Sequence, residues 1–185
     1  MSEWIIQPIT PTPEHLDGLA ALLVETVASG GSVSFLHPLE PAEARRFWTG
    51  SLEAAARSER VVLGAFEAGR IVGTVTVFLG LPENQPHRGE IGKLMTAVSH
   101  RGRGVARALM AAAEALARDR GKSLLVLDTA EEEGAAPLYE RLGYERAGVI
   151  PHFAFKPQGG LSGTILFWKQ IAPLPGSPAR ASARR

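Results

Sequence analysis

The chain has 185 residues, 45% of them hydrophobic, which suits one folded domain and excludes a disordered protein. Its 20 lysines and arginines nearly balance its 19 aspartates and glutamates, so nucleic acid is not an expected partner. Cysteine is absent, which excludes disulfides, thiolate metal sites and a covalent thiol intermediate. Apolar runs are far shorter than the about 20 residues of a membrane helix, and the N-terminus carries no export signal, so we expect a cytoplasmic protein without a membrane partner.

The first third of the chain predicts one strand and two helices. Residues 4–8 are a short apolar run that ends at a proline, and the simplest interpretation is a first strand. Thr12 and Pro13 supply a cap and a first-turn proline for a helix that reaches Val27, and a second helix is expected over residues 41–57. Residues 32–38 between them are expected to be irregular.

The remainder alternates between strand and helix patterns. Residues 60–67 and 71–79 flank a tight Ala68–Gly69 turn and predict an antiparallel hairpin, whereas residues 81–89 hold two prolines and should be irregular. A strand over residues 90–97, a helix from Val105 to about Arg120 and a strand over 123–129 follow. A short helix over 135–142 and strands over 144–155 and 161–169 complete the pattern.

These elements predict an α/β (α+β) fold with a mixed, mostly antiparallel sheet of six to seven strands and about four flanking helices. The strand–helix–strand unit over residues 90–129 is a crossover, so its two strands should be parallel. We expect a single domain over residues 1–171. Residues 172–185 are rich in turn-forming and basic residues and are expected to be a flexible, solvated tail.

The segment between the strand at 90–97 and the next helix predicts an anion site. Gly102 and Gly104 let the backbone approach a ligand closely, the helix start adds positive partial charge, and Arg101 and Arg103 add full charges. A diphosphate is the natural occupant; a glycine-rich connection with two solvated arginines is the alternative. Arg107 stands where a dinucleotide fingerprint would have its third glycine, and no Walker sequence follows.

The run from Arg101 to Ala106 reads Arg-x-x-Gly-x-Ala and resembles the coenzyme A pyrophosphate loop of the Gcn5-related N-acetyltransferase (GNAT) family. The likeness extends over residues 4–169 and includes a second motif at 135–144. It implies the GNAT fold, in which the two parallel strands splay apart and the pantetheine arm of acetyl-CoA lies in the gap. The residues it assigns to the cofactor are Leu94, Met95, Thr96, Arg101, Gly102, Arg103, Gly104, Val105 and Ala106, with the Met95 N–H polarising the thioester carbonyl. Val98 and Glu132 depart from the family's usual Pro and Asn, and the second departure weakens an amide contact there.

Four segments are also similar to the tabtoxin-resistance branch of the family, which acetylates the amino group of a β-lactam amino acid. They are residues 32–38, 81–88, 124–130 and 167–169. The resemblance implies that Glu90 and Asp128 form a pair of bases and that the Tyr139 hydroxyl lies beside the sulfur as the acid.

The residues themselves leave alternatives for these three roles. Asp128 ends the apolar run 124–127, where a merely structural charge would be costly, but it could also cap or turn the chain. Glu90 could equally be a solvent-facing strand residue. Tyr139 could pack the short helix onto the sheet, which does not exclude a role as proton donor.

The acceptor site is expected to use uncharged polar groups from two loops. These residues are Ser34, Phe35, His37, Asn84, Gln85 and His87, and each could instead satisfy its own loop. The prolines at 81–86 suggest a lid over a small site. Five scattered histidines argue against a metal.

The sequence therefore predicts direct acetyl transfer from acetyl-CoA to the amine of a small molecule, such as a β-lactam or amino-acid-like toxin. An acetyltransferase for a protein N-terminus or lysine, and a non-catalytic acetyl-CoA-binding domain, are the alternatives. A homodimer is the expected assembly by resemblance.

Overall fold

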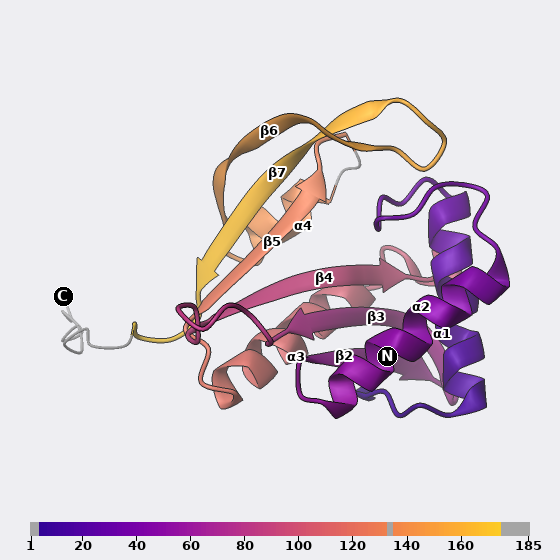
Figure 1. The fold of residues 1–185 in the computed structure, drawn as a ribbon, viewed down its shortest axis with the longest axis horizontal. Coiled ribbons are helices and arrows are strands. Elements are labelled where there is room, and N and C mark those ends of the chain that lie inside the picture. The colour runs from indigo at the N-terminus through magenta and orange to yellow at the C-terminus, as the bar shows by residue number, and fades with distance from the viewer. Residues whose placement is uncertain (1–3, 133–134, 175–185) are drawn as a thin grey trace.

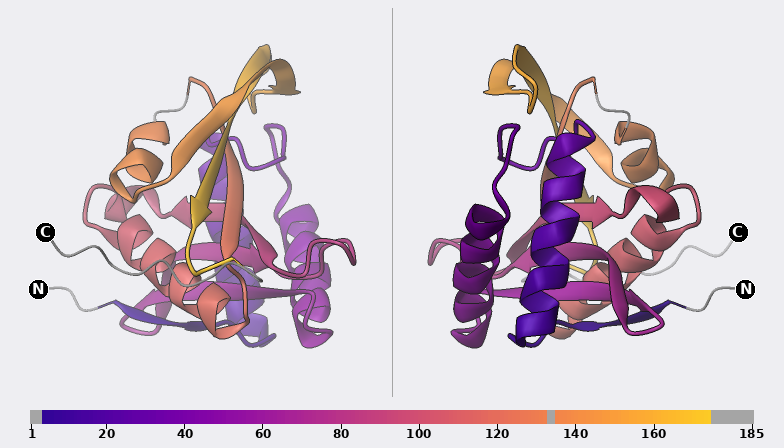
Figure 2. Two further views of the ribbon diagram at one scale, coloured as in Figure 1. Left: turned by 90° about the vertical axis from the view of Figure 1, so that its left-hand side faces the viewer. Right: turned by 90° about the vertical axis from the view of Figure 1, so that its right-hand side faces the viewer.

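The computed structural model describes residues 4–132 and 135–174, which form one seven-stranded mixed sheet with helices on both faces (Figures 1 and 2). The strand order is β1-β2-β3-β4-β5-β7-β6, and β4 with β5 is the parallel pair. The predicted fold class is confirmed. Residues 175–185, most of the predicted tail, lie outside the described residues.

The elements follow the predicted order. They are β1 (Ile5–Pro8), α1 (Pro13–Ala28), α2 (Pro41–Ala56), β2 (Arg60–Glu67), β3 (Arg70–Phe78), β4 (Arg88–Thr96), the 3₁₀ turn η1 (Val98–His100), α3 (Val105–Asp119), β5 (Leu124–Ala130), α4 (Ala136–Arg141), β6 (Glu145–Phe155) and β7 (Leu161–Gln170). β4 begins at Arg88, two residues before the predicted start, because Arg88 already pairs with Leu124 of β5.

Two hydrophobic cores lie on opposite faces of the sheet. α1 and α2 cover one face, and α3 and α4 lie on the other (Figure 2). The residues of β2 alternate between them: Leu63 joins the core under α3, whereas Val62 and Phe66 join the core under α1 and α2. The period-two pattern of this strand thus places one helical layer on each side.

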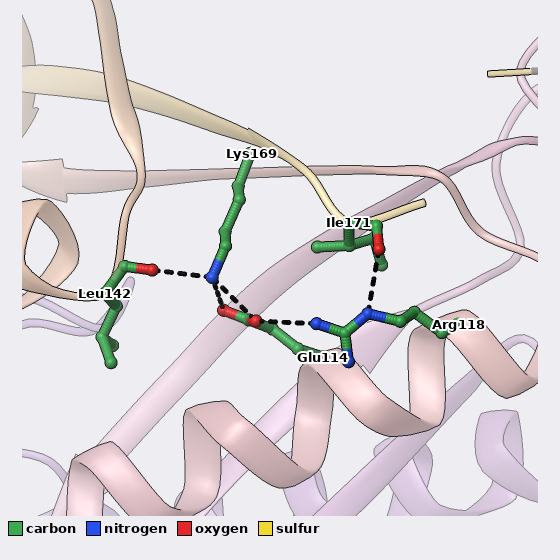
Figure 3. A network of polar contacts seen from close by, with 5 residues as sticks. All are labelled: Glu114, Arg118, Leu142, Lys169 and Ile171. Atoms are coloured by element: carbon green, nitrogen blue, oxygen red, sulfur yellow. Dashed lines mark hydrogen bonds and ion pairs between the residues drawn. The ribbon is translucent and has the colours of Figure 1, made fainter. Parts of the chain in front are cut away.

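A polar network joins α3 to the far end of the sheet (Figure 3). Lys169 of β7 donates to both carboxylate oxygens of Glu114 on α3, at 2.7 and 2.8 Å, and to the carbonyl oxygen of Leu142 at 2.6 Å. Arg118 donates to Glu114 and to the carbonyl of Ile171. The Glu114 side chain is only 9% exposed, so its charge depends on these partners. The network therefore ties β7 and the end of α4 to α3.

Breaking this network should destabilise the protein. Lys169→Met leaves a buried carboxylate with Arg118 alone, and we expect the free energy of unfolding to fall by about 2–3 kcal/mol in urea denaturation. Adding Glu114→Gln should restore part of the loss. Asp17→Asn, which removes an exposed ion pair with Arg45, is the matched control and should change little; equal losses would contradict this account.

Candidate active site

The parallel strands pair only at their beginnings. Arg88, Gly89 and Glu90 of β4 pair with Leu124, Leu125 and Val126 of β5. Beyond them β5 continues alongside β7 as far as Ala130, while β4 stays with β3 as far as Thr96. The two strands then diverge and leave a wedge, which is visible where β5 and β7 separate from β4 and β3 (Figure 1). A cavity of about 650 Å³ opens there.

The cavity draws its lining from both arms of the wedge and from the loop after α1. The lining residues that carry the argument are Ser34, Lys93, Leu94, Thr96, Arg101, Asp128 and Tyr139. Backbone groups of the two diverging strands lack the ladder partners that a continuous sheet would supply. The opening is therefore suited to an elongated polar ligand that bonds to a strand edge.

A β-bulge in β4 sets which side chains enter this cavity. Thr74 pairs with Met95 and Thr76 with Gly92, so Val75 of β3 faces both Lys93 and Leu94. Lys93 has a φ of 52°, in the left-handed region that favours glycine. The extra residue turns the Lys93 side chain to the α1–α2 face, where it meets Ser34 and the rings of Phe35 and Phe47.

The alternation of amides along β4 identifies those that face the cavity. Ala97 donates its N–H to the carbonyl of Val72, so the Met95 amide also points toward β3 and those of Thr96 and Leu94 point away from it. The expected role of the Met95 N–H in polarising a carbonyl is thus not supported by the strand geometry. The Leu94 N–H, next to the bulge, is the better placed donor.

The turn before α3 has the backbone expected of an anion cradle. Gly102 and Gly104 have φ values of 73° and 93°, which side chains disfavour, and no side chain caps the start of α3 at Val105 and Ala106. Its first amides therefore remain available for an anion.

The two arginines of this turn point in different directions. Arg101 lines the cavity and donates to the Ser29 hydroxyl at 2.7 Å. Arg103 instead donates to Glu67 at 3.0 Å and lies 5.0 Å from the ring centre of Trp4. Arg101 is consequently the arginine placed to meet a ligand in the wedge.

Asp128 and Tyr139 both line the cavity. The Asp128 carboxylate accepts from the Thr164 hydroxyl at 2.9 Å and is otherwise open to the cavity, so it escapes the burial that its apolar run suggested. Tyr139 is buried against Phe167 and Tyr144. Burial, and then the charge of Asp128, raise the pKa of Tyr139 to about 12, so its phenol stays protonated at any physiological pH.

Glu90 lies apart from this pair. It is the last residue of β4 paired to β5, opposite Val126, and its carboxylate accepts from Arg88 at 3.0 Å. Asp128 is two residues beyond Val126, so the two Cα atoms are about 8 Å or more apart. The two carboxylates share a sheet face, and Asp128 is the one that lines the cavity.

The two loops expected to bind the acceptor have different positions. Ser34 lines the cavity and Phe35 packs on Phe47, while the exposed His37 donates its backbone N–H to the carbonyl of Pro157 in the β6–β7 turn. The loop after α1 thereby bridges the two arms of the wedge.

The loop with Asn84, Gln85 and His87 lies at the closed end of the wedge. Gln85 accepts from Arg88, and the His87 carbonyl accepts from Ser123 and Leu124 at the start of β5. None of the three lines the cavity, so this loop does not form the lid expected from its prolines.

Lys93 is a cavity residue that the sequence pattern did not predict. Strict alternation along residues 90–97 would place Lys93 and Gly92 on different faces of the sheet. Lys93 would then lie on the buried face under α3, where burial of its charge would be unfavourable. A lysine next to a glycine inside an apolar strand was the available signal for a bulge. Burial lowers the pKa of Lys93 and Arg60 adds to this, whereas the charge of Asp128 opposes it.

The described part of the chain holds neither a cluster of metal-ligating side chains nor a helix that could span a membrane. Across residues 4–132 and 135–174, no group of three histidine, aspartate or glutamate side chains could hold a metal ion. Within the same ranges, no helix has the length and apolar character needed to cross a bilayer.

The model of the acetyltransferase (GNAT) family matches residues 24–144, more than half of the chain. The chain belongs to this family. Membership confirms the resemblance found in the sequence. It also confirms the expected enzyme class, an acyltransferase, and the expected cofactor, a coenzyme A thioester.

The curated relatives that this chain matches are aligned with it over only part of their own length. N-alpha-acetyltransferase MAK3 of Arabidopsis thaliana is 32% identical over 110 residues, which are 59% of this chain and 57% of that protein. N-acetyltransferase 8 of Rattus norvegicus is 36% identical over 89 residues, 45% of this chain and 39% of that protein. The chain thus spans about two fifths to just over half of these relatives.

Solved structures share the fold over nearly the whole chain. Ribosomal-protein-alanine N-acetyltransferase from Brucella melitensis superposes with a TM-score of 0.76 and 25% identity, covering 90% of this chain and 99% of that one. An aminoglycoside 6′-N-acetyltransferase complexed with coenzyme A gives 0.71 and 21%, covering 92% and 99%.

The cavity of this GNAT protein fits a coenzyme A thioester. The wedge exposes the Thr96 and Leu94 amides for an amide-rich arm, and the uncapped α3 start with Arg101 suits a diphosphate. Such a ligand would supply an activated acetyl group at the deep part of the wedge.

Coenzyme A affinity should depend on Arg101 more than on Arg103. We expect Arg101→Ala to weaken binding about tenfold in titration calorimetry, because a charge-assisted contact to the diphosphate is lost. Arg103→Ala is the matched control and should have a smaller effect, since Glu67 and Trp4 already hold that side chain. Pantetheine lacks the diphosphate, so a similar loss for pantetheine would contradict the assignment.

Proposed function

We propose that this protein transfers the acetyl group of acetyl-CoA directly to the amine of a small molecule. The observation that carries the proposal is the wedge between β4 and β5, which brings the Leu94 amide, Asp128 and Tyr139 to one cavity beside the anion-binding turn. Direct transfer is favoured because the chain has no cysteine to carry the acetyl group.

Asp128 is the proposed base. An acceptor amine arrives mostly as ammonium at neutral pH, and the Asp128 carboxylate can bind that charge before it takes a proton, directly or through water. The hydrogen bond from Thr164 orients the carboxylate toward the cavity. Glu90, paired with Arg88 at the closed end of the wedge, is assigned a secondary role through water.

Tyr139 and the β4 backbone would complete the chemistry. The Leu94 N–H can stabilise the negative charge that develops on the carbonyl oxygen as the amine attacks. Tyr139 can donate a hydrogen bond to the departing thiolate, because its raised pKa keeps the proton on the phenol.

The bridge above the cavity favours a small acceptor. His37 bonds to Pro157, and Gln158 donates from its side chain to the carbonyls of Val27 and Ala28. These contacts join the loop after α1 to the β6–β7 turn and narrow the acceptor side of the cavity. An amino-acid-like toxin, such as a β-lactam of the tabtoxinine type, is the finer candidate within this class.

A protein N-terminus or lysine is the second candidate acceptor. The similarity to a named N-alpha-acetyltransferase and to a named ribosomal-protein-alanine acetyltransferase favours it. We place either reaction in the cytoplasm, where acetyl-CoA is supplied.

A homodimer stays a prediction, with the exposed apolar residues Val149, Ile150 and Phe153 of the edge strand β6 as its candidate surface.

An acceptor screen tests the proposal. Release of free coenzyme A should be measured with acetyl-CoA and matched panels of amino acids, aminoglycosides, polyamines and N-terminal peptides, with N-acetylated peptides as controls. We expect turnover with small amines. Turnover with peptides alone would favour the second candidate, and binding of acetyl-CoA without release by any acceptor would indicate a non-catalytic domain.

Removing the hydroxyl of Tyr139 tests its proposed role as hydrogen-bond donor to the thiolate. Tyr139→Phe should lower kcat about a hundredfold with little change in the KM for acetyl-CoA. The loss should be the same from pH 6 to pH 10, because a group with a pKa of about 12 does not titrate in this range. Tyr144→Phe, on the neighbouring ring, is the control; an alkaline fall in rate that disappears only in Tyr139→Phe would show that Tyr139 titrates and contradict the assignment.

A further inference from the structure

The Lys93 ammonium is a charge in the cavity that the chemistry above does not use. It donates to the Ser34 hydroxyl at 2.8 Å, and its nitrogen lies 5.6 and 5.9 Å from the ring centres of Phe47 and Phe35. Within residues 4–132 and 135–174, no carboxylate lies within 4.0 Å of it. Its charge is therefore only partly compensated by the protein.

An acceptor that fills the cavity would remove water from the Lys93 ammonium, and this desolvation is unfavourable unless the acceptor replaces the lost hydrogen bonds. A lysine ammonium has three hydrogens to donate, and Ser34 accepts one of them. The rings shield one side, and the side chain lines the cavity, where water can serve the remaining hydrogens. An acceptor that displaces this water without an anionic group would leave a desolvated charge unpaired.

The opposite wall of the cavity carries the opposite charge. Asp128 extends from β5 on the far arm of the wedge, whereas Lys93 extends from the bulge in β4. Both side chains line the same cavity, next to the Leu94 amide that we assign to the acetyl carbonyl. A cation and an anion from different strands thus line the cavity in which we propose that the amine attacks.

We infer that Lys93 anchors an anionic group of the acceptor while Asp128 receives its amine, so that the acceptor is a zwitterion with the two groups close together, as in an α-amino acid. This inference rests on the proposed function and narrows it. It also assigns Ser34, with its φ of 75°, to holding the lysine in place rather than to binding substrate alone.

The environment of Lys93 agrees with this role. Burial and Arg60 of β2 lower its pKa, while Asp128 raises it. A bound carboxylate would also raise the pKa of Lys93 and would thereby stabilise the ammonium in the complex. The competing explanation is that Lys93 serves only to moderate the charge of Asp128.

Matched acceptors separate these explanations. The twenty common L-amino acids and their α-amides should be compared as acceptors for the wild type, Lys93→Met and Lys93→Arg, by coenzyme A release. The amides keep the amine and lose the anion. Lys122→Met is the control, because Lys122 is a buried lysine but donates to the carbonyls of Leu79 and Pro86 and does not line the cavity.

The wild type should prefer acids to their amides, and Lys93→Met should raise the KM for acids about 30-fold while changing the amides less than about threefold. Lys93→Arg should retain most of the preference, and Lys122→Met all of it. Equal losses for acids and amides would mean that Lys93 acts through Asp128 and would overturn the inference. Turnover of other amines without amino acids would overturn it as well, while the absence of any acceptor would refute the proposed function instead.

Discussion

Strands β4 and β5 share a parallel ladder over only three residue pairs, and the rest of the site depends on its early end. After Glu90 and Val126 each strand keeps a different antiparallel neighbour, β3 for one and β7 for the other. The sheet is therefore continuous at the base of the wedge and divided at its mouth. Unpaired strand backbone needs a partner, and a ligand with its own amides can provide one.

The two arms of the wedge are held in place from outside the cavity. The contacts of Lys169 with Glu114 and the Leu142 carbonyl anchor the far arm to α3, whose own start forms the anion-binding turn (Figure 3). On the open side, His37 and Gln158 link the loop after α1 to the β6–β7 turn. The separation of Asp128 from the β4 backbone is thus determined by packing and polar contacts remote from the chemistry.

Local backbone irregularity determines which side chains of β4 line the cavity. The bulge at Lys93 brings a cation to the wall that faces Asp128 and aligns the Leu94 amide with the cavity. A regular strand would have directed that lysine into the core under α3. Natural sheets place bulges beside functional sites for this reason, since one extra residue redirects a side chain without changing the strand order.

The order of elements, the crossover and the glycine turn before α3 could be predicted from the residues alone, because each depends on local signals: apolar period, caps, and glycines before a helix. It also indicated Asp128 and Tyr139, which follow or lie within recognisable motifs. Three features became known only from the folded chain: Arg103 turns to Glu67, the loop with Asn84, Gln85 and His87 lies at the closed end of the wedge, and Lys93 enters the cavity. These outcomes depend on which distant groups become neighbours and on a register shift against β3, and neither quantity is contained in the spacing of residues along one strand.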